Sequence, residues 1–172
     1  TVLQDDPLLT CRLPGCRSPL RVICETRLRT PLNARVVRTA GEFPTLLATC
    51  CGERERLRPY EEAGCQALVL PPRGKGVDLT ALMAELGSRE VDSVLLEGGG
   101  ALNWSALESG IVNRVQAYLA PKILGGAEAK GPVGGLGADS PAGAFRLTSP
   151  TVTRLGEDIL LESEVISCLQ GS

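Results

Sequence analysis

A chain of 172 residues, of which 43% are apolar and 22% are charged, has the length and composition of one soluble globular domain. Its net charge of −2 provides no basic field for holding nucleic acid, and no run reaches the ~18 consecutive apolar residues that span a bilayer. The sequence contains no histidine, which excludes histidine-activated nucleophiles, histidine-ligated zinc and the usual general acid or base near neutral pH.

Apolar runs alternate with helical windows from about residue 20 to residue 124. Strands are predicted at residues 20–25, 44–50, 65–71, 91–100 and 114–121. Helices are predicted at residues 53–64, where Pro59 interrupts the pattern, and at residues 78–90 and 101–110. The second of these helices has apolar side chains at a period of 3.6 residues, and Asp78 is its expected N-cap.

The C-terminal part has a different pattern. Residues 125–143 hold seven glycines and two prolines, which predicts a long loop. Residues 145–166 predict two antiparallel strands joined near Gly156. Because several earlier strands are apolar throughout, as strands buried on both faces are, we expect a three-layer α/β/α fold. Its central sheet would be mostly parallel, with an antiparallel C-terminal hairpin.

The seven cysteines are interpreted as reduced thiols rather than as a metal site or a disulfide framework. Their number is odd, Cys50 and Cys51 are adjacent, and no pair has the C-x-x-C spacing typical of zinc sites. A basic and then apolar secretory leader does not open the chain either. We therefore expect a cytoplasmic protein that holds no metal and uses its cysteines as small apolar residues.

The sharpest candidate for a ligand site is Glu97-Gly98-Gly99-Gly100, between a predicted strand and a predicted helix. Consecutive glycines let a phosphate approach the backbone, and a helix start offers free N–H groups with a partial positive charge. A dinucleotide pyrophosphate at the end of a strand fits this pattern, with Asn103 and Ser105 as further donors. The pattern is not G-x-G-x-x-G, and a tight turn with a purely structural role explains it equally well.

Two cations are weaker candidates. Arg12, in the sequence DDPLLTCR, could hold a substrate phosphate through its planar fork of donors, although a surface ion pair with Asp5 or Asp6 is the alternative. Lys122 follows a predicted strand and could contact an anion or simply extend over the surface.

Five segments together carry a resemblance to a known family. In chain order they are TVLQDDPLLTCR, PLRVICETRLRTP, SVLLEGGGALNWSAL, AYLAPKILGG and VTRLGEDILLESEV. Their order and spacing resemble the riboflavin-biosynthesis reductase domain, the C-terminal domain of the bifunctional pyrimidine deaminase/uracil reductase. The resemblance implies a dihydrofolate-reductase-like fold and a homodimer. It also implies NADPH-dependent reduction of 5-amino-6-(5-phosphoribosylamino)uracil to 5-amino-6-(5-phosphoribitylamino)uracil.

The resemblance further implies which residues bind the two ligands. Leu9, Arg12 and Glu97 are expected to contact the substrate, with Arg12 near the ribose phosphate. The expected cofactor contacts are Thr1, Asp5, Thr26, Gly99, Gly100, Ala101, Leu102, Asn103, Trp104 and Ser105. Glu25-Thr26 stands where the family more usually has Asp-Ser. No catalytic residue is assigned, because the cofactor would carry the chemistry.

Two departures from the family pattern set the expected domain organisation. Residues 1–172 are expected to form a single reductase domain that lacks its N-terminal elements, because the chain opens at Thr1 within the pattern. A deaminase domain upstream is inferred from the family alone. The deaminase signatures H-x-E and P-C-x-x-C are absent from the chain, which is therefore not expected to bind a catalytic zinc ion.

Three other functions remain open from the sequence. Two are reductases of the same fold, namely dihydrofolate reductase and the diaminopyrimidine ribotide reductase that acts before deamination. The third is a module that keeps the fold and binds a nucleotide without catalysis, which ligand-induced stabilisation without turnover would reveal.

Overall fold

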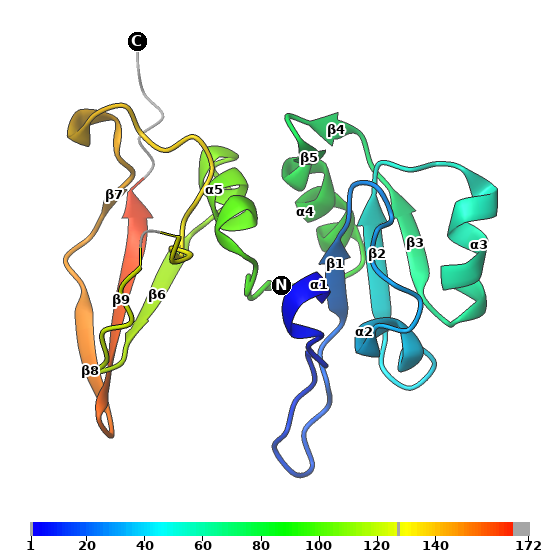
Figure 1. The fold of residues 1–172 in the computed structure, drawn as a ribbon, viewed down its shortest axis with the longest axis horizontal. Coiled ribbons are helices and arrows are strands. Elements are labelled where there is room, and N and C mark those ends of the chain that lie inside the picture. The colour runs from blue at the N-terminus through cyan, green and yellow to red at the C-terminus, as the bar shows by residue number, and fades with distance from the viewer. Residues whose placement is uncertain (1, 127, 167–172) are drawn as a thin grey trace. The chain divides into compact units, whose positions relative to one another are not determined.

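The structure is a computed structural model, and it describes residues 2–126 and 128–166. Its contacts divide the chain into two compact units, with the boundary between Val94 and Leu95 (Figure 1). Each unit has its own sheet, and each is described by itself below.

The first unit is built on a parallel sheet of three strands. In chain order these strands are β1 (Arg21–Cys24), β2 (Thr45–Thr49) and β3 (Gln66–Val69), and β2 is the central strand. Ile23 of β1 is in register with Leu47 of β2, which is in register with Ala67 of β3. All five residues of β2 are buried, as expected for the central strand of a parallel sheet. The three strands predicted here from apolar runs are thus confirmed.

Helices and a small hairpin complete this unit (Figure 1). The helices are α1 (Val2–Asp5), α2 (Arg35–Arg38), α3 (Arg54–Glu62) and α4 (Leu79–Ser88), and the hairpin strands are β4 (Pro72–Arg73) and β5 (Gly76–Val77). The Asp78 side chain accepts hydrogen bonds from the backbone N–H groups of Thr80 and Ala81, which confirms it as the N-cap of α4.

Helix α3 continues through Pro59, so the predicted interruption is wrong. A proline removes one backbone donor from the helix, but burial of Leu57 and Tyr60 on the same helix favours its continuation. These two side chains belong to the core of the first unit, together with Ile23, Val36, Val37, Leu47 and Cys65.

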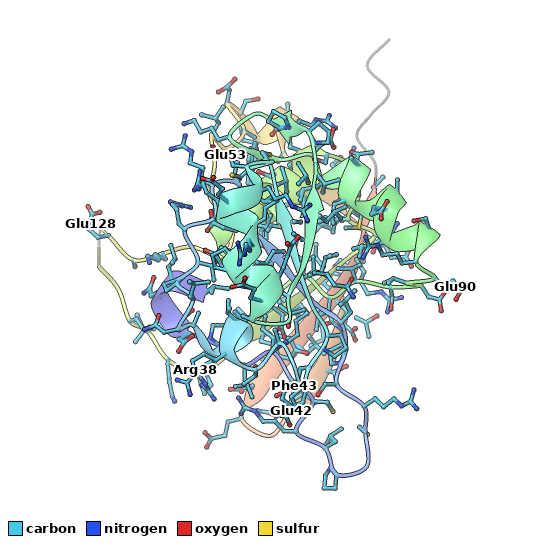
Figure 2. The ribbon with its side chains drawn as sticks, turned by 90° about the vertical axis from the view of Figure 1, so that its right-hand side faces the viewer. Arg38, Glu42, Phe43, Glu53, Glu90 and Glu128 are labelled. Carbon is cyan, nitrogen blue, oxygen red and sulfur yellow. The ribbon has the colours of Figure 1, made fainter. Side chains whose placement is uncertain are left out.

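Charged side chains such as Glu53 and Glu90 are exposed and project outward from the ribbon (Figure 2).

Substituting Gly87→Ala is expected to stabilise the first unit by about 0.5–1 kcal/mol, because alanine loses less backbone entropy than glycine in a helix. Gly87 lies in α4, is exposed, and has open space where a Cβ atom would stand. The midpoint of urea denaturation, compared with that of the unchanged protein, measures the effect. A lower midpoint would contradict the prediction.

The second unit is built on antiparallel strands. Helix α5 (Gly100–Glu108) precedes β6 (Arg114–Leu119), and β7 (Arg146–Leu147), β8 (Thr151–Leu155) and β9 (Asp158–Ile166) follow the long loop. Strand β9 pairs antiparallel with β6, β7 and β8. Gly156 has φ 65° in the tight turn between β8 and β9, where glycine is favoured. The predicted helix, strand and C-terminal hairpin are therefore confirmed.

The strand predicted at residues 91–100 is wrong. No ladder pairing joins residues 92–99 to another strand in the described part of the chain, and α5 begins at Gly100. Val94, Leu95 and Leu96 are 47%, 73% and 39% exposed rather than buried. An apolar run forms a strand only where a neighbouring strand supplies ladder hydrogen bonds, and the boundary between the two units lies within this run. The α/β class holds, but the parallel and antiparallel strands form separate sheets.

Candidate functional site

The glycine turn of the second unit ends in a helix start with free donors. Gly99 is the N-cap of α5, is exposed, and makes no side-chain capping bond. Its carbonyl accepts hydrogen bonds from the N–H groups of Leu102 and Asn103, at 2.9 and 3.1 Å. The N–H groups of Gly100 and Ala101 come earlier in the helix, where an α-helix supplies no acceptor. Together with the helix dipole, these N–H groups could bind an anion such as a phosphate group.

The third glycine of this turn also serves close packing. A Cβ atom on Gly100 would stand 2.8 Å from the backbone nitrogen of Gly134 and 3.1 Å from the carbonyl oxygen of Gly131. The N–H of Gly134 donates to the carbonyl of Gly100 at 2.9 Å. Gly100 therefore lacks a side chain for a packing reason, which is compatible with a ligand at the exposed Gly99 and Ala101.

The side chains expected to add donors are engaged within the chain. The Nδ2 atom of Asn103 donates to the carbonyl of Pro132 at 2.8 Å, and the hydroxyl of Ser105 donates to the carbonyl of Ala101 at 3.1 Å. Asn103 Oδ1 is buried without a hydrogen-bond partner among the described residues, so the contact of this side chain is with the chain itself. The ring of Trp104 packs edge-on against Phe145, with centroids 5.6 Å apart.

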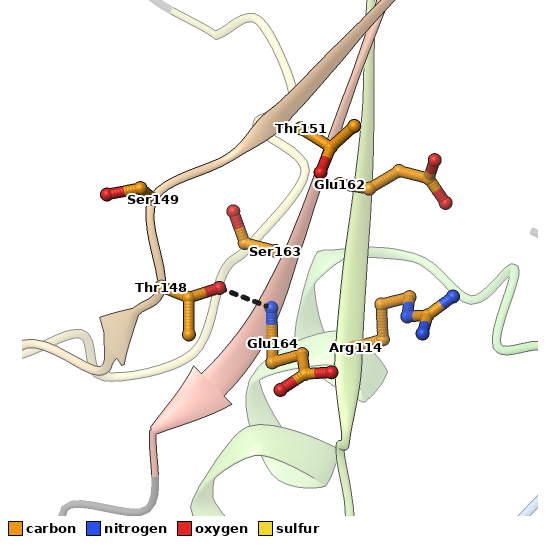
Figure 3. A pocket seen from close by; sticks show the side chains of 7 residues that line it. All are labelled: Arg114, Thr148, Ser149, Thr151, Glu162, Ser163 and Glu164. Atoms are coloured by element: carbon orange, nitrogen blue, oxygen red, sulfur yellow. Dashed lines mark hydrogen bonds between the residues drawn. The ribbon is translucent and has the colours of Figure 1, made fainter.

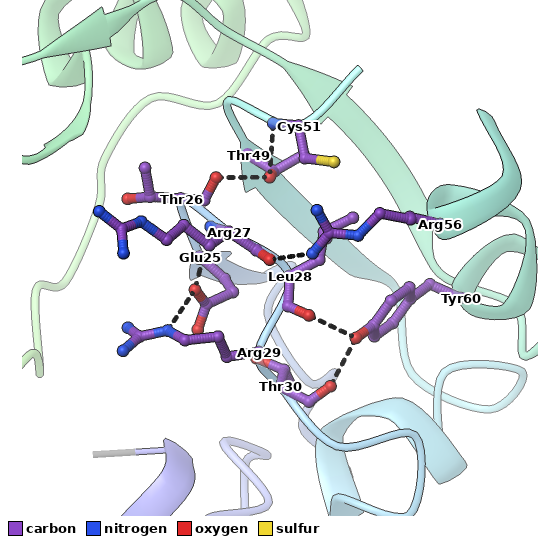
Figure 4. A network of polar contacts seen from close by, with 10 residues as sticks. All are labelled: Glu25, Thr26, Arg27, Leu28, Arg29, Thr30, Thr49, Cys51, Arg56 and Tyr60. Atoms are coloured by element: carbon purple, nitrogen blue, oxygen red, sulfur yellow. Dashed lines mark hydrogen bonds and ion pairs between the residues drawn. The ribbon is translucent and has the colours of Figure 1, made fainter. Parts of the chain in front are cut away.

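In the first unit, the residues after β1 form a loop that is tied down at several points (Figure 4). Glu25 is 6% exposed, and its carboxylate accepts hydrogen bonds from the Arg27 N–H at 3.2 Å and from Arg29 Nε at 3.3 Å. The carbonyl of Thr26 accepts from the Thr49 hydroxyl at 3.2 Å. Leu28 has φ 52°, in the left-handed region. This polar network holds Thr26, an expected cofactor contact, at the end of a parallel strand, where such sheets bind ligands.

Tyr60 is the anchor of this loop on α3. Its hydroxyl lies 3.3 Å from the carbonyl oxygen of Leu28 and 2.6 Å from that of Thr30, and the ring is buried. The guanidinium of Arg56 donates to the carbonyl of Arg27 on the outer side of the loop. Backbone groups of the loop are thus bonded by side chains from a helix.

Tyr60→Phe is expected to lower the free energy of unfolding by about 1–3 kcal/mol, because it leaves buried carbonyls of the loop without a donor. Chemical denaturation of the two proteins measures the loss. Tyr118→Phe is the matched control, since Tyr118 is 64% exposed on β6 and should change stability little. Equal stability of the Tyr60 variant and the unchanged protein would show that the loop does not need this anchor.

The N-terminal segment of the first unit carries the other expected contacts. Asp5 is exposed at the end of α1, Leu9 is half-buried against the core, and Arg12 is exposed. Among the described residues no ion pair joins Arg12 to Asp5 or Asp6, so the alternative explanation of Arg12 is not observed. Thr1 lies outside the described residues.

The expected contacts thus belong to two groups. Asp5, Leu9, Arg12 and Thr26 lie in the first unit, whereas Glu97 and the start of α5 lie in the second. Glu97 is exposed, as is Lys122 beyond β6.

A shallow hollow of about 240 Å³ on the antiparallel sheet contains none of the expected contact residues (Figure 3). It is lined by Arg114, Thr148, Ser149, Thr151, Glu162, Ser163 and Glu164.

Burial disfavours thiolate chemistry at three cysteines of the first unit. Burial raises the pKa of Cys24 to about 11 and also raises the pKa values of Cys50 and Cys65, so these thiols stay protonated near neutral pH. In the described ranges, no group of three or more histidine, cysteine, aspartate or glutamate side chains is arranged to hold a metal ion. The described helices include none that is long and apolar enough to cross a membrane.

Comparison with known protein families identifies the family to which this chain belongs. Residues 1–161 match the model of the RibD C-terminal domain. The chain belongs to the RibD C-terminal domain family. The resemblance inferred from five sequence segments is thereby confirmed.

Individual relatives agree with this membership. The chain is 46% identical to riboflavin biosynthesis protein RibD of Actinobacillus pleuropneumoniae, covering 98% of this chain and 45% of that protein. It is 37% identical to 2,5-diamino-6-ribosylamino-4(3H)-pyrimidinone 5′-phosphate reductase of Methanothermobacter thermautotrophicus, covering 96% of this chain and 76% of that protein. The chain therefore spans somewhat less than half of the RibD relative.

Solved structures confirm the fold. RibD of Acinetobacter baumannii superposes with a TM-score of 0.77 at 24% identity, covering 96% of this chain and 44% of that one. The yeast riboflavin biosynthesis reductase Rib7 superposes with a TM-score of 0.72 at 20% identity, covering 96% and 72%. The dihydrofolate-reductase-like α/β fold expected from the sequence is the fold of these proteins.

Sequence reasoning missed two features of this family member. The network around Glu25 and Tyr60 includes hydrogen bonds between residues 30 and 32 positions apart, and no local sequence pattern predicts it. The second feature is the packing of residues 131–135 against α5, where a Cβ atom on Gly135 would stand 2.2 Å from the Trp104 ring. The signal for it is the concentration of glycines in the long loop, which by itself predicts only a loop.

Proposed function

We propose that this chain reduces 5-amino-6-(5-phosphoribosylamino)uracil to 5-amino-6-(5-phosphoribitylamino)uracil with NADPH, in riboflavin biosynthesis. The observation that carries the proposal is the uncapped start of α5 after the glycine turn, in a chain of the RibD C-terminal domain family. A structural neighbour from Thermotoga maritima, with a TM-score of 0.71, is named a diaminohydroxyphosphoribosylaminopyrimidine deaminase/5-amino-6-(5-phosphoribosylamino)uracil reductase. The reductase part of that name supports this choice of substrate.

The residues of the chain bind and orient the two ligands. When bound, NADPH would supply the hydride for C1′ of the opened ribose and become NADP⁺, and one proton from solvent would complete the reduction. In the second unit, the first N–H groups of α5 hold the diphosphate. In the first unit, the Thr26 hydroxyl in the tied loop after β1 is a cofactor contact. The exposed guanidinium of Arg12 holds the phosphate of the sugar, and the Glu97 carboxylate accepts hydrogen bonds from amino and ring N–H groups of the pyrimidine. Holding both ligands together supplies the rate enhancement.

The proposal includes a cytoplasmic homodimer, which rests on family resemblance. It also includes preference for NADPH over NADH. Glu97 and the start of α5 are the substrate and cofactor contacts of the second unit in this proposal. Asp5, Leu9, Arg12 and Thr26 are those of the first unit, and Thr1 is a further cofactor contact outside the described residues.

A second candidate substrate is the diamino compound that has not yet been deaminated. It is favoured by the names of two relatives, 37% and 31% identical, which are 2,5-diamino-6-ribosylamino-4(3H)-pyrimidinone 5′-phosphate reductases. The two substrates differ in one exocyclic group of the ring, so they present different donors and acceptors to the same site.

Steady-state oxidation of NADPH by the full-length protein tests the proposal. Turnover is expected with the aminouracil ribotide. The Kd for NADPH is expected to be about tenfold lower than the Kd for NADH, which corresponds to about 1.4 kcal/mol of binding free energy. Faster turnover of the diamino compound would select the second substrate. Thermal stabilisation by NADPH without turnover of either compound would favour a binding module. Equal or undetectable binding of both nucleotides to a folded protein would overturn the redox role.

A further inference from the structure

Arg21 is a buried cation with only neutral partners. It is the first residue of β1, is 2% exposed, and its guanidinium lies 5.3 Å from the centre of the Phe43 ring. In the part of the chain that the structure describes, no ion pair joins it to a carboxylate. Desolvation is the main influence on its pKa, which is lowered. The nearby Cys65 and Glu42 act on this pKa in the opposite direction, but less strongly than desolvation does. Burying a charge that forms no ion pair is costly, so the hydrogen bonds of Arg21 indicate what it is retained for.

Those hydrogen bonds join Arg21 to five other residues. The acceptors are the carbonyl oxygens of Leu8, Val36 and Phe43 and the hydroxyls of Thr39 and Thr45, at 2.5–3.1 Å. Four of these residues lie within or next to α2 and β2, which follow each other in the chain. Leu8 lies far from them in sequence, before β1. Arg21 therefore connects the body of the first unit to the chain segment that contains Leu8.

That segment, residues 6–12, has an unusual backbone. Asp6 and Leu9 have φ angles of 39° and 54°, which non-glycine residues seldom adopt. Asp6 is held by its carboxylate, which accepts a hydrogen bond from the N–H of Arg35 at 2.8 Å, at the start of α2. Leu8 is held by Arg21 Nη1, at 3.0 Å. The two anchored residues, Asp6 and Leu8, flank Pro7, and Leu8 directly precedes Leu9. These anchors therefore oppose relaxation of the strained backbone.

We propose that Arg21 is a positioning residue, which holds residues 6–12 so that Leu9 and Arg12 meet the phosphoribosyl substrate. This inference rests on the proposed function. Arg12 lies four residues beyond the anchored carbonyl of Leu8, and its side chain is exposed and free to bind an anion. Since Arg21 itself is buried, it acts on the substrate only through this segment.

Arg21→Lys in the full-length protein tests the proposal. Lysine keeps the charge, but its single nitrogen lacks the fork that reaches Leu8, α2 and β2 together. We expect the KM for the ribotide to rise about tenfold or more and the KM for NADPH to change much less. Arg21→Gln is expected to act in the same direction, and where that variant fails to fold Arg21→Lys decides the question.

Leu82→Val is the control for general destabilisation. Leu82 is 2% exposed in α4, and the acceptors of Arg21 lie in other parts of the first unit. Loss of one buried methylene group should lower the melting temperature and leave the KM for the ribotide unchanged. Equal rises of that KM in Leu82→Val and Arg21→Lys would overturn the positioning role, because general destabilisation would then explain both.

A double-mutant cycle with Arg12→Ala separates positioning from a structural role. If Arg21 acts through Arg12, adding Arg21→Lys to Arg12→Ala should raise the KM for the ribotide by much less than it does alone. If the KM of the double variant instead rises by the product of the two single effects, Arg21 acts on something other than Arg12.

Hydrogen exchange of the backbone provides a readout that does not need turnover. Arg21→Lys should increase exchange across residues 6–12 while β2 keeps its protection. If the unchanged protein does not turn over, the proposed function fails, and exchange still decides whether Arg21 holds this segment. Unchanged exchange in residues 6–12 of a folded variant would overturn the inference.

Discussion

Arg12→Ala is expected to raise the KM for the phosphoribosyl substrate by about 10- to 100-fold and to leave the KM for NADPH nearly unchanged. Hydrogen bonds between a charged donor and phosphate contribute about 1.5–3 kcal/mol each, and about 1.4 kcal/mol corresponds to a factor of ten. The Arg12 side chain is exposed, and no ion pair with a neighbouring carboxylate competes for it among the described residues. Removal of this side chain should therefore weaken substrate binding rather than destabilise the fold. Steady-state kinetics with each ligand varied in turn measures the two KM values.

Two further variants define what the Arg12 result means. Arg12→Lys keeps the charge but loses the planar fork, so it should recover only part of the affinity. Arg17→Ala is the matched control, because Arg17 is another exposed arginine five positions further along the same connection to β1. A KM for the ribotide that is unchanged in Arg12→Ala, or raised equally in Arg17→Ala, would contradict the phosphate role.

Local patterns are sufficient for most of the elements. The buried run of β2 and the period and N-cap of α4 are properties of adjacent residues, and both are predicted from the sequence. The apolar run at residues 91–96 shows the limit of such patterns, because its composition is that of a strand while its pairing depends on other parts of the chain. Pro59 shows the same limit in α3, where burial of Leu57 and Tyr60 outweighs a local helix breaker.

The candidate site is predictable in its residue types but not in its supporting contacts. Glycines followed by a helix start are visible in the sequence, and the structure gives Gly99 an uncapped, exposed position there. Arg21 is a different case. In the sequence it is one basic residue at the start of a strand, where surface exposure is the ordinary expectation. Its burial depends on acceptors from residues 8, 36, 39, 43 and 45, and such convergence cannot be seen before the chain is folded.

Gly100→Ala is expected to weaken NADPH binding by about tenfold or more and to destabilise the second unit by about 1–3 kcal/mol. The new Cβ atom would stand 2.8 Å from the Gly134 nitrogen and 3.1 Å from the Gly131 oxygen, both of which are backbone atoms that cannot rotate away. The loop must shift, the hydrogen bond from Gly134 to Gly100 is lost, and the first donors of α5 move with the helix start. Isothermal titration with NADPH and thermal unfolding measure the two effects.

The matched control for this substitution lies on the other side of the same contact. A Cβ atom on Gly131 would have its closest contact at 3.6 Å, with the carbonyl oxygen of Val133, which is an ordinary van der Waals distance. Gly131→Ala should therefore bind NADPH as the unchanged protein does. If Gly100→Ala lowers the melting temperature but binds NADPH normally, the start of α5 has a packing role alone and the diphosphate binds elsewhere. Loss of NADPH affinity confined to Gly100→Ala instead supports the helix start as the cofactor contact, because the two variants add the same methyl group to the same loop contact.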